Sequence, residues 1–264
     1  MSVSADDLPY MTFIQACFLF FSAWLSGVLN SVAGGGGLII FPALLLTGLS
    51  PINANATSTL ASSTGYIASV AAYHDKLPAQ QQLSWLLGGV SVIGGLLGAV
   101  LLLYTPTGTF NQLVPYLMLI ATLLFTFARS IEILLKIAPE TSQNSRSFLL
   151  KAAIIQFFIS VYGGFYGLGL SFLMLATLSL LGIRDIYQIN ALKVLMMLCI
   201  DSFAIITFVV VGVIAWQQAV LMMVGTAIGG YSGAYYTRQL KPESVRRFII
   251  VIAWGITSYF FFSK

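Results

Sequence analysis

The chain has 264 residues, of which 58% are hydrophobic and 8% are charged, with a net charge of +4 at neutral pH. Soluble domains carry about 25% charged residues, so this composition excludes an ordinary soluble domain and indicates a protein that crosses a bilayer several times. Basic residues gather in the cytoplasmic loops of such proteins, so the small positive charge implies no nucleic-acid partner.

Apolar segments follow one another along the chain, and most reach the roughly 20 residues that a helix needs to cross a bilayer. The predicted segments are 12–29, 35–48, 52–73, 82–104, 111–137, 149–164, 168–181, 187–213, 217–236 and 244–262. These unbroken runs lack the alternation of membrane β-strands, so we expect an all-α polytopic membrane protein of about ten transmembrane or half-membrane helices. The segments 35–48 and 168–181 are the two short ones.

The distribution of basic residues predicts the orientation, because Lys and Arg accumulate in short cytoplasmic loops. With both termini outside, ten segments put the basic residues near the cytoplasmic ends. These residues are Lys76, Arg129, Lys136, Arg146, Lys151, Arg184, Arg238, Lys241, Arg246 and Arg247. The loops 49–52, 105–111 and 214–217, which are then outside, contain no charged residue.

A weak internal duplication relates the two halves of the chain. A shift of 135 positions pairs Asn55 with Asn190 and Gly98 with Gly233. Each half holds five segments, an odd number, so the second half must be inverted relative to the first. We predict one integrated membrane domain with a first repeat over 1–137, a cytoplasmic linker over 138–148 and a second repeat over 149–264.

Glycines mark corresponding positions in the two halves. In inverted-repeat transporters the substrate site lies near the midplane, and short or Gly-interrupted segments point to it. A helix that restarts after such a break offers unpaired N–H groups and a partial positive charge, which suit an anion. The sequence leaves two geometries open: the first two segments of each half either cross the whole bilayer or form a re-entrant hairpin. The glycines at the two breaks are Gly34, Gly35, Gly36, Gly37, Gly167 and Gly169.

Polar side chains recur at helical spacing after the first break. Ser58, Ser62 and Tyr66 follow Asn55 along one stripe, and the 135-residue shift lays this stripe on Asn190, Lys193, Met197 and Asp201. A Lys at the bilayer centre costs on the order of 3 kcal/mol and is usually functional. Lys193 can therefore contact the substrate, but it can also reach the cytoplasmic surface or pair with Asp201. Asp201 is a candidate coupling carboxylate or a structural partner.

Two other glycine sets predict close helix packing rather than chemistry. They are Gly94, Gly95 and Gly98 in the first half and Gly229, Gly230 and Gly233 in the second. Gly230 to Gly233 also match the Gly-x-Ser-Gly pattern of intramembrane serine proteases, but Ser232 pairs with Leu97 under the same shift and His74 is the sole histidine. We expect no enzyme, no metal and no cofactor, because the sequence shows no ligand cluster or nucleotide motif.

The residues around the first break resemble the TauE/SafE sulfite exporter family. The matching runs are Asn30 to Pro42, Gly48 to Pro51 and Ala54 to Ser58, with a weaker second copy at Gly163 to Gly169 and Asn190 to Lys193. This resemblance implies a bacterial inner-membrane exporter of sulfite or small organosulfonates. The second copy departs from the pattern, because Leu170 and Ser171 stand where the first copy has Gly36 and Gly37.

The expected function is therefore export of a small sulfur-containing anion by alternating access. A small-anion channel and a membrane scaffold without transport are the alternatives. The expected partners are the anion and the lipid bilayer, with the oligomeric state open. The predicted substrate-binding residues are Asn30, Gly34, Gly35, Gly36, Gly37, Asn55, Ser58, Ser62, Tyr66, Tyr166, Gly167, Gly169, Ser171, Asn190 and Lys193, with Asp201 as the possible coupling residue.

Overall fold

The computed structural model describes residues 11–32, 36–73, 81–135, 146–181, 183, 186–236 and 242–262. These residues form ten helices and contain no strand. The helices are α1 (Phe13–Val32), α2 (Gly37–Leu46), α3 (Pro51–Tyr73), α4 (Gln81–Tyr104), α5 (Thr107–Leu135), α6 (Arg146–Phe165), α7 (Leu170–Leu180), α8 (Ile186–Val211), α9 (Trp216–Tyr236) and α10 (Pro242–Phe262). The prediction of an all-helical membrane protein is confirmed.

The outside of the helix bundle is apolar. Trp85, Phe158 and Val210 are 81%, 67% and 80% exposed. Five helices, α1, α4, α5, α6 and α8, contain a stretch that is long and apolar enough to cross a membrane. Large exposed apolar side chains are unfavourable in water but match lipid tails, so the surface agrees with the composition.

The two short predicted segments form half-length helices. α2 has 10 residues and α7 has 11, which correspond to about 15 and 17 Å at 1.5 Å per residue. The hydrocarbon core of a bilayer is about 30 Å thick, so neither helix can cross it alone. A helix interruption precedes each of them, because α2 begins after the end of α1 and α7 begins after the end of α6.

Local chemistry explains where several helices end and begin. Gly48 follows α2 with a φ of 92°, a left-handed conformation that favours glycine after a helix end. Ser50 then caps α3, because its Oγ accepts a hydrogen bond of 3.3 Å from the backbone N–H of Asn53. Pro51 occupies the first position of α3, where its missing N–H costs nothing.

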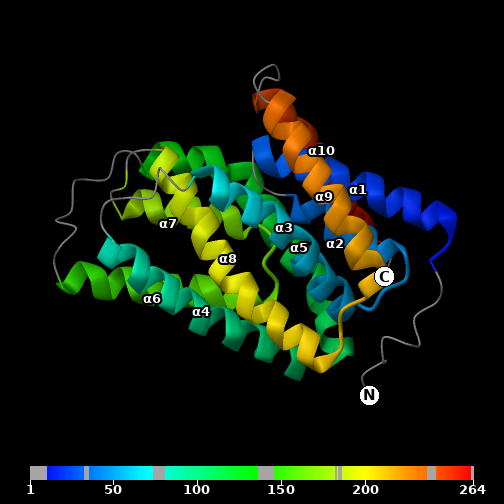
Figure 1. Cartoon of the computed structure of the whole chain (residues 1–264), viewed down its shortest axis with the longest axis horizontal. Helices are drawn as coiled ribbons and strands as arrows, with labels where there is room; N and C mark the ends of the chain where they lie inside the picture. Colours follow the sequence, from blue (N-terminus) through cyan, green and yellow to red (C-terminus); the bar gives the residue numbers. More distant parts are fainter. Residues whose placement is uncertain are drawn as a thin grey trace.

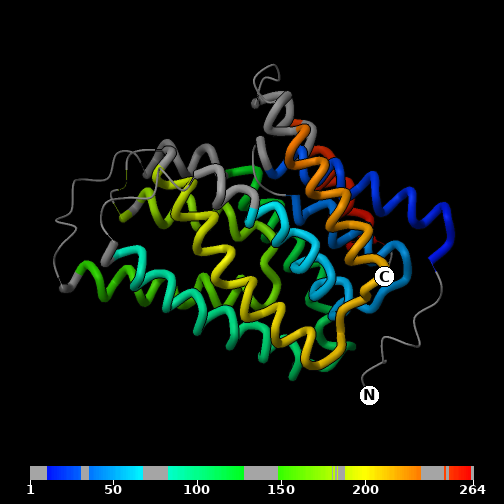
Figure 2. The backbone as a smooth tube through the Cα atoms, in the orientation of Figure 1, coloured from blue at the N-terminus to red at the C-terminus, as the bar shows by residue number. Residues whose placement is uncertain are grey.

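The helix packing is reciprocal between the first five and the last five helices (Figure 1). α1 packs along α9, and α4 packs along α6, while α3 lies against α8 in the centre. The trace in Figure 2 shows the central α3 and α8 in cyan and yellow. In the two halves α1 corresponds to α6, α3 to α8 and α4 to α9. The pair α1–α9 therefore corresponds to the pair α6–α4, and the pair α3–α8 corresponds to itself, as expected of related repeats. The repeat boundaries themselves stay a prediction.

Glycines allow two of these helix pairs to approach closely. A Cβ at Gly98 of α4 would overlap the carbonyl oxygen of Val161 in α6, and a Cβ at Gly229 of α9 would overlap that of Trp24 in α1. The predicted packing role is confirmed for Gly94, Gly95, Gly98 and Gly229. The backbone of Gly230 also lies in the α1–α9 contact, because a Cβ at Gly27 would lie 2.7 Å from the Gly230 nitrogen, although a Cβ added at Gly230 itself would have no atom within 4 Å. The surroundings of Gly233 lie outside the described residues.

Candidate functional site

The two helix interruptions meet inside the bundle. Gly37 starts α2, and a Cβ added there would lie 3.8 Å from Cγ of Leu168 in the turn between α6 and α7. Each half of the chain therefore brings one half-length helix start to the same place. Irregular backbone at membrane depth is tolerated only where protein or a water-filled cavity shields it. This arrangement is the one expected of the re-entrant geometry.

The α6–α7 turn is held by backbone conformation and by two side chains. Gly167 and Gly169 have φ values of 71° and 78°, which only glycine adopts without strain. The Tyr162 hydroxyl donates a hydrogen bond of 2.6 Å to the carbonyl of Leu168. Nδ2 of Asn55 donates to the carbonyl of Phe165 over 3.1 Å, which ties the start of α3 to the end of α6.

A cavity opens beside the meeting point of the two turns. It offers about 40 Å³ to the centre of a water molecule, and one water needs about 10–15 Å³ by this measure, so a small ion fits. α3 and α8 form its sides, with the start of α2 and the α6–α7 turn between them. The lining residues are Gly37, Ser58, Thr59, Ser62, Tyr66, Tyr166, Gly167, Leu168, Leu170, Met197 and Asp201.

Many of the predicted site residues come together in this cavity. They are Gly37, Ser58, Ser62, Tyr66, Tyr166, Gly167 and the possible coupling residue Asp201. The sequence analysis missed the apolar part of the lining, Leu168 and Leu170, because nothing separates these residues from the many other Leu side chains in the chain. Thr59 and Met197 lie on the polar stripes but were not predicted to contact the substrate.

The other predicted residues that the structure describes do not line the cavity. Asn30 lies near Gly65, whose added Cβ would be 3.8 Å from Nδ2 of Asn30. The backbone of Gly36 packs against Ser26, that of Gly169 packs against Ala121, and Ser171 is buried. Asn55, Asn190 and Lys193 make hydrogen bonds outside the cavity lining. Gly34 and Gly35 lie outside the described residues.

Tyr166 borders the cavity, and its hydroxyl group is buried in the protein without a partner. Its side chain is 1% exposed, and its hydroxyl oxygen is buried without a hydrogen-bond partner. Its ring packs edge-on against Phe41 at 5.3 Å and Phe110 at 6.2 Å between ring centroids. A buried hydroxyl without a partner costs roughly 1–3 kcal/mol, so its retention points to a ligand that completes it.

The hydroxyl groups of α3 differ in what they can offer. Ser58 and Thr59 both donate to the carbonyl of Asn55 over 2.9 Å, so they present only lone pairs to the cavity. Among the described residues, the hydroxyl groups of Ser62 and Tyr66 make no hydrogen bond and remain able to donate. The cavity therefore contains both acceptors and uncommitted donors.

The charged groups of α8 are separated by position. Asp201 is 7% exposed and lines the cavity. The Lys193 ammonium group donates to Oδ1 of Asn190 over 2.9 Å, one turn before Met197, and lies outside the lining. Lys193 therefore pairs with Asn190 rather than with Asp201, the predicted alternative, and a contact of Lys193 with substrate stays a prediction.

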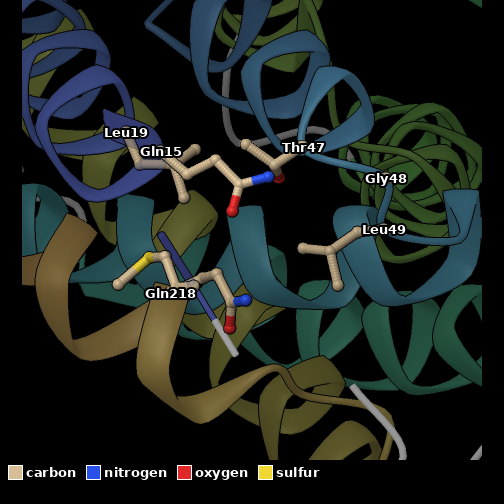
Figure 3. Close-up of a pocket in the computed structure, with 7 residues that line it drawn as sticks. Gln15, Leu19, Thr47, Gly48, Leu49 and Gln218 are labelled. Carbon is tan, nitrogen blue, oxygen red and sulfur yellow. The ribbon is translucent and has the colours of Figure 1, made fainter. Parts of the chain in front are cut away.

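A second, smaller cavity of about 20 Å³ lies where α1 and α9 begin (Figure 3). The carboxamides of Gln15 and Gln218 approach it from α1 and α9, with Thr47 and Gly48 from the link after α2. Oε1 of Gln15 accepts a hydrogen bond from the backbone N–H of Thr12. No predicted site residue lines this cavity, and neither helix interruption reaches it.

The serine of the Gly-x-Ser-Gly pattern makes a hydrogen bond within its own helix. Oγ of Ser232 donates to the carbonyl of Gly229 within α9 over 3.1 Å. A nucleophile needs a base within hydrogen-bond reach, and His74 lies outside the described residues.

A bundle of lipid-facing helices in which two half-length helices start at one polar cavity defines a membrane transporter. The sequence matches the family described as Sulfite exporter TauE/SafE over residues 19–260, so the chain belongs to this family. The resemblance found in the glycine run is thereby confirmed.

Curated relatives carry transporter names. The chain is 28% identical over 242 residues to a "Probable membrane transporter protein" of Haemophilus influenzae, covering 91% of this chain and 92% of the relative. It is also 28% identical to "Probable membrane transporter protein YfcA" of Escherichia coli K12, covering 89% and 85% of the two chains. The identity to "Probable membrane transporter protein YdhB" of Bacillus subtilis is 23%, covering 85% and 90%. No solved structure matches the chain.

Proposed function

We propose that this transporter exports a small sulfur-containing anion, sulfite or a small organosulfonate, across the bacterial cytoplasmic membrane by alternating access. In this proposal both termini lie outside the cytoplasm. The observation that carries it is the meeting of two helix starts at one cavity with unpaired hydroxyl groups.

The helix starts provide the attraction for negative charge. A helix start carries about half a positive charge from the aligned peptide dipoles. At α2 and α7 this charge remains, although the N–H groups of Ile39, Leu170 and Phe172 already donate to the carbonyls of Gly36, Gly167 and Gly169. Two starts, at α2 and α7, face the same space beside Gly37 and Gly167. Their effect adds to about one positive charge, which suits a small anion better than a neutral solute.

The side chains around the cavity would complete the hydrogen bonds of the anion. Ser62, Tyr66 and Tyr166 would donate to its oxygens, and the apolar Leu168 and Leu170 would contact a methyl or methylene group of a sulfonate. Asn30, Asn55, Asn190 and Lys193 would act outside this first contact, with Lys193 attracting anions towards the cytoplasmic end of the cavity.

Counterflow tests the proposal. Purified protein in liposomes is loaded with excess unlabelled sulfite or methanesulfonate, and uptake of a trace of the same labelled anion is measured. A carrier gives transient accumulation of the label, because loaded sites return faster than empty ones. Sulfate serves as a larger, doubly charged competitor, and protein-free liposomes give the background.

The two alternatives give different results. An anion channel would conduct net flux without counterflow accumulation of label. A scaffold without transport would show neither flux nor a shift of thermal unfolding with sulfite or methanesulfonate. Either result contradicts the proposed carrier.

A further inference from the structure

The cavity proposed for an anion also contains a carboxyl group. Asp201 lines it together with Ser62 and Tyr66, and its side chain is 7% exposed. Within the described residues, no basic side chain lines the cavity or forms an ion pair with Asp201. An ionised carboxylate and an anion in one small cavity between membrane helices repel each other, because the effective dielectric constant beside buried protein groups is lower than in water.

A proton removes this repulsion. We propose that the carboxyl group of Asp201 binds a proton whenever the anion occupies the cavity, so that anion and proton cross the membrane together as a symport. This inference rests on the proposed anion transport. The proton adds to one carboxylate oxygen on one side of the membrane and leaves the same oxygen on the other side, so no covalent bond of the anion changes.

The neighbours of Asp201 do not offer another way to neutralise its charge. From α3, Tyr66 faces the same cavity, and Tyr166 reaches it from the α6–α7 turn. Tyr162 of α6 donates its hydroxyl to the carbonyl of Leu168. The described side chains of α4 near α8, and those of α7, carry no charge.

Two other ionisable side chains that the structure describes on α8 point elsewhere. Sγ of Cys199 faces α4, because a Cβ added at Gly88 would lie 3.9 Å from it. Lys193 is bonded to Asn190 two turns away from Asp201 along α8. Asp201 is therefore the acidic group that the proposed anion meets, and its proton is the charge that must accompany a negative substrate.

Electrostatics also determines the coupling mode. The proton and the anion favour each other's binding because their charges are opposite, whereas antiport requires two ligands that exclude each other. Symport of one proton with a monovalent anion moves no net charge. The pH difference and the anion concentrations then determine the direction, so export requires an excess of anion in the cytoplasm.

The test uses the full chain in liposomes with methanesulfonate, which stays singly ionised throughout the pH range used. Counterflow at equal pH on both sides first tests anion transport itself. A pH difference of one unit, acidic outside, is then imposed with the membrane potential clamped at zero. We expect methanesulfonate to accumulate about tenfold, the ratio of the proton activities, with one proton entering per anion as followed by a trapped pH-sensitive dye.

Asp201→Asn keeps the shape of the side chain but cannot bind and release a proton near neutral pH. We expect this variant to lose accumulation driven by the pH difference. Ser202→Ala is the matched control, because Ser202 is the next residue on α8, donates to the carbonyl of Leu198 and does not line the cavity. It should behave as the unmodified chain.

The outcomes separate the two proposals. Absence of counterflow in the unmodified chain contradicts anion transport and removes the symport with it. Counterflow without accumulation driven by the pH difference in the unmodified chain overturns the symport alone, and this result is independent of how the Asp201 variant folds. Accumulation that persists in Asp201→Asn overturns the role of this carboxyl group.

Discussion

Tyr162 near the end of α6 and Tyr166 in the following turn differ in how their hydroxyl groups are used. The Tyr162 hydroxyl is used within the protein, because it donates to the carbonyl of Leu168 over 2.6 Å. The Tyr166 hydroxyl is buried at the cavity and has no partner. The first group supports the turn, and the second is not used within the protein.

Replacing Tyr166 by Phe should weaken anion binding without destabilising the fold. A hydrogen bond to a charged ligand contributes about 1.5–3 kcal/mol, which corresponds to roughly 10- to 150-fold in affinity. Titration of sulfite and methanesulfonate by thermal shift measures this loss. Tyr162→Phe is the control and should lower the unfolding temperature instead, because it leaves a buried carbonyl unpaired. Unchanged affinity in Tyr166→Phe would contradict a contact with the anion.

Lys193 tests the long-range part of the site. Replacing Lys193 by Met should abolish anion transport, because the positive charge is removed. Membrane insertion should stay intact, because Met keeps a long unbranched side chain. Lys151, an exposed residue of α6, provides the control Lys151→Met, which should transport normally. Counterflow at low and high ionic strength checks the result. Normal flux in Lys193→Met would remove this residue from the site.

At the scale of elements, the half-length helices depend on glycine turns. Gly167 has a φ of 71°, and a Cβ there would lie 3.0 Å from the carbonyl oxygen of Gly163. A left-handed conformation costs a residue with a Cβ about 1–2 kcal/mol. The turn can therefore be weakened by a single methyl group, and the two helix starts would then no longer face one space.

Gly167→Ala should lower both the stability and the transport rate. We expect a loss of about 1–2 kcal/mol in the free energy of unfolding, together with slower counterflow. Gly89→Ala in α4 is the matched control, because nothing lies within 4 Å of an added Cβ there. This control should be neutral or stabilising by up to about 1 kcal/mol, since Ala favours helix over Gly. Equal behaviour of the two variants in thermal unfolding would contradict the strained turn.

At the scale of the whole molecule, the helix pairs α1–α9 and α4–α6 connect one half of the chain to the other. The two helices of each pair approach so closely at these glycines that one helix cannot slide along the other without loss of packing. A single Cβ at Gly98 or Gly229 would already overlap the partner helix. The contact of Gly37 with Leu168 is looser, because a Cβ added at Gly37 would lie at an ordinary distance of 3.8 Å from the Leu168 side chain. We therefore expect alternating access to separate the turns while both outer pairs stay together.

A cross-link between the turns tests this motion. Gly37→Cys and Leu168→Cys, in a chain whose Cys17 and Cys199 are replaced by Ala, would place two thiols at the meeting point. Oxidation should stop counterflow, and reduction should restore it. Each single cysteine variant under the same oxidant is the control. Transport that continues with the disulfide formed would show that the turns need not separate.

The sequence by itself was sufficient for the fold class, the two short segments and the family. These features follow from composition, segment length and the glycine run, which act locally and need no knowledge of distant contacts. The polar stripe of α3 was likewise readable from helical spacing, and Ser58, Ser62 and Tyr66 do line one cavity.

Only the tertiary structure decided which of these groups share that space. Lys193 and Asp201 belong to the same predicted stripe on α8, yet Asp201 lines the cavity and Lys193 bonds to Asn190 outside it. The repeat predicted that the two glycine breaks share one site, but the particular contact of Gly37 with Leu168 was not predictable, since it depends on how two distant turns fold back. Helical spacing determines the direction of a side chain around its own axis, whereas what that side chain meets depends on how the neighbouring helices cross.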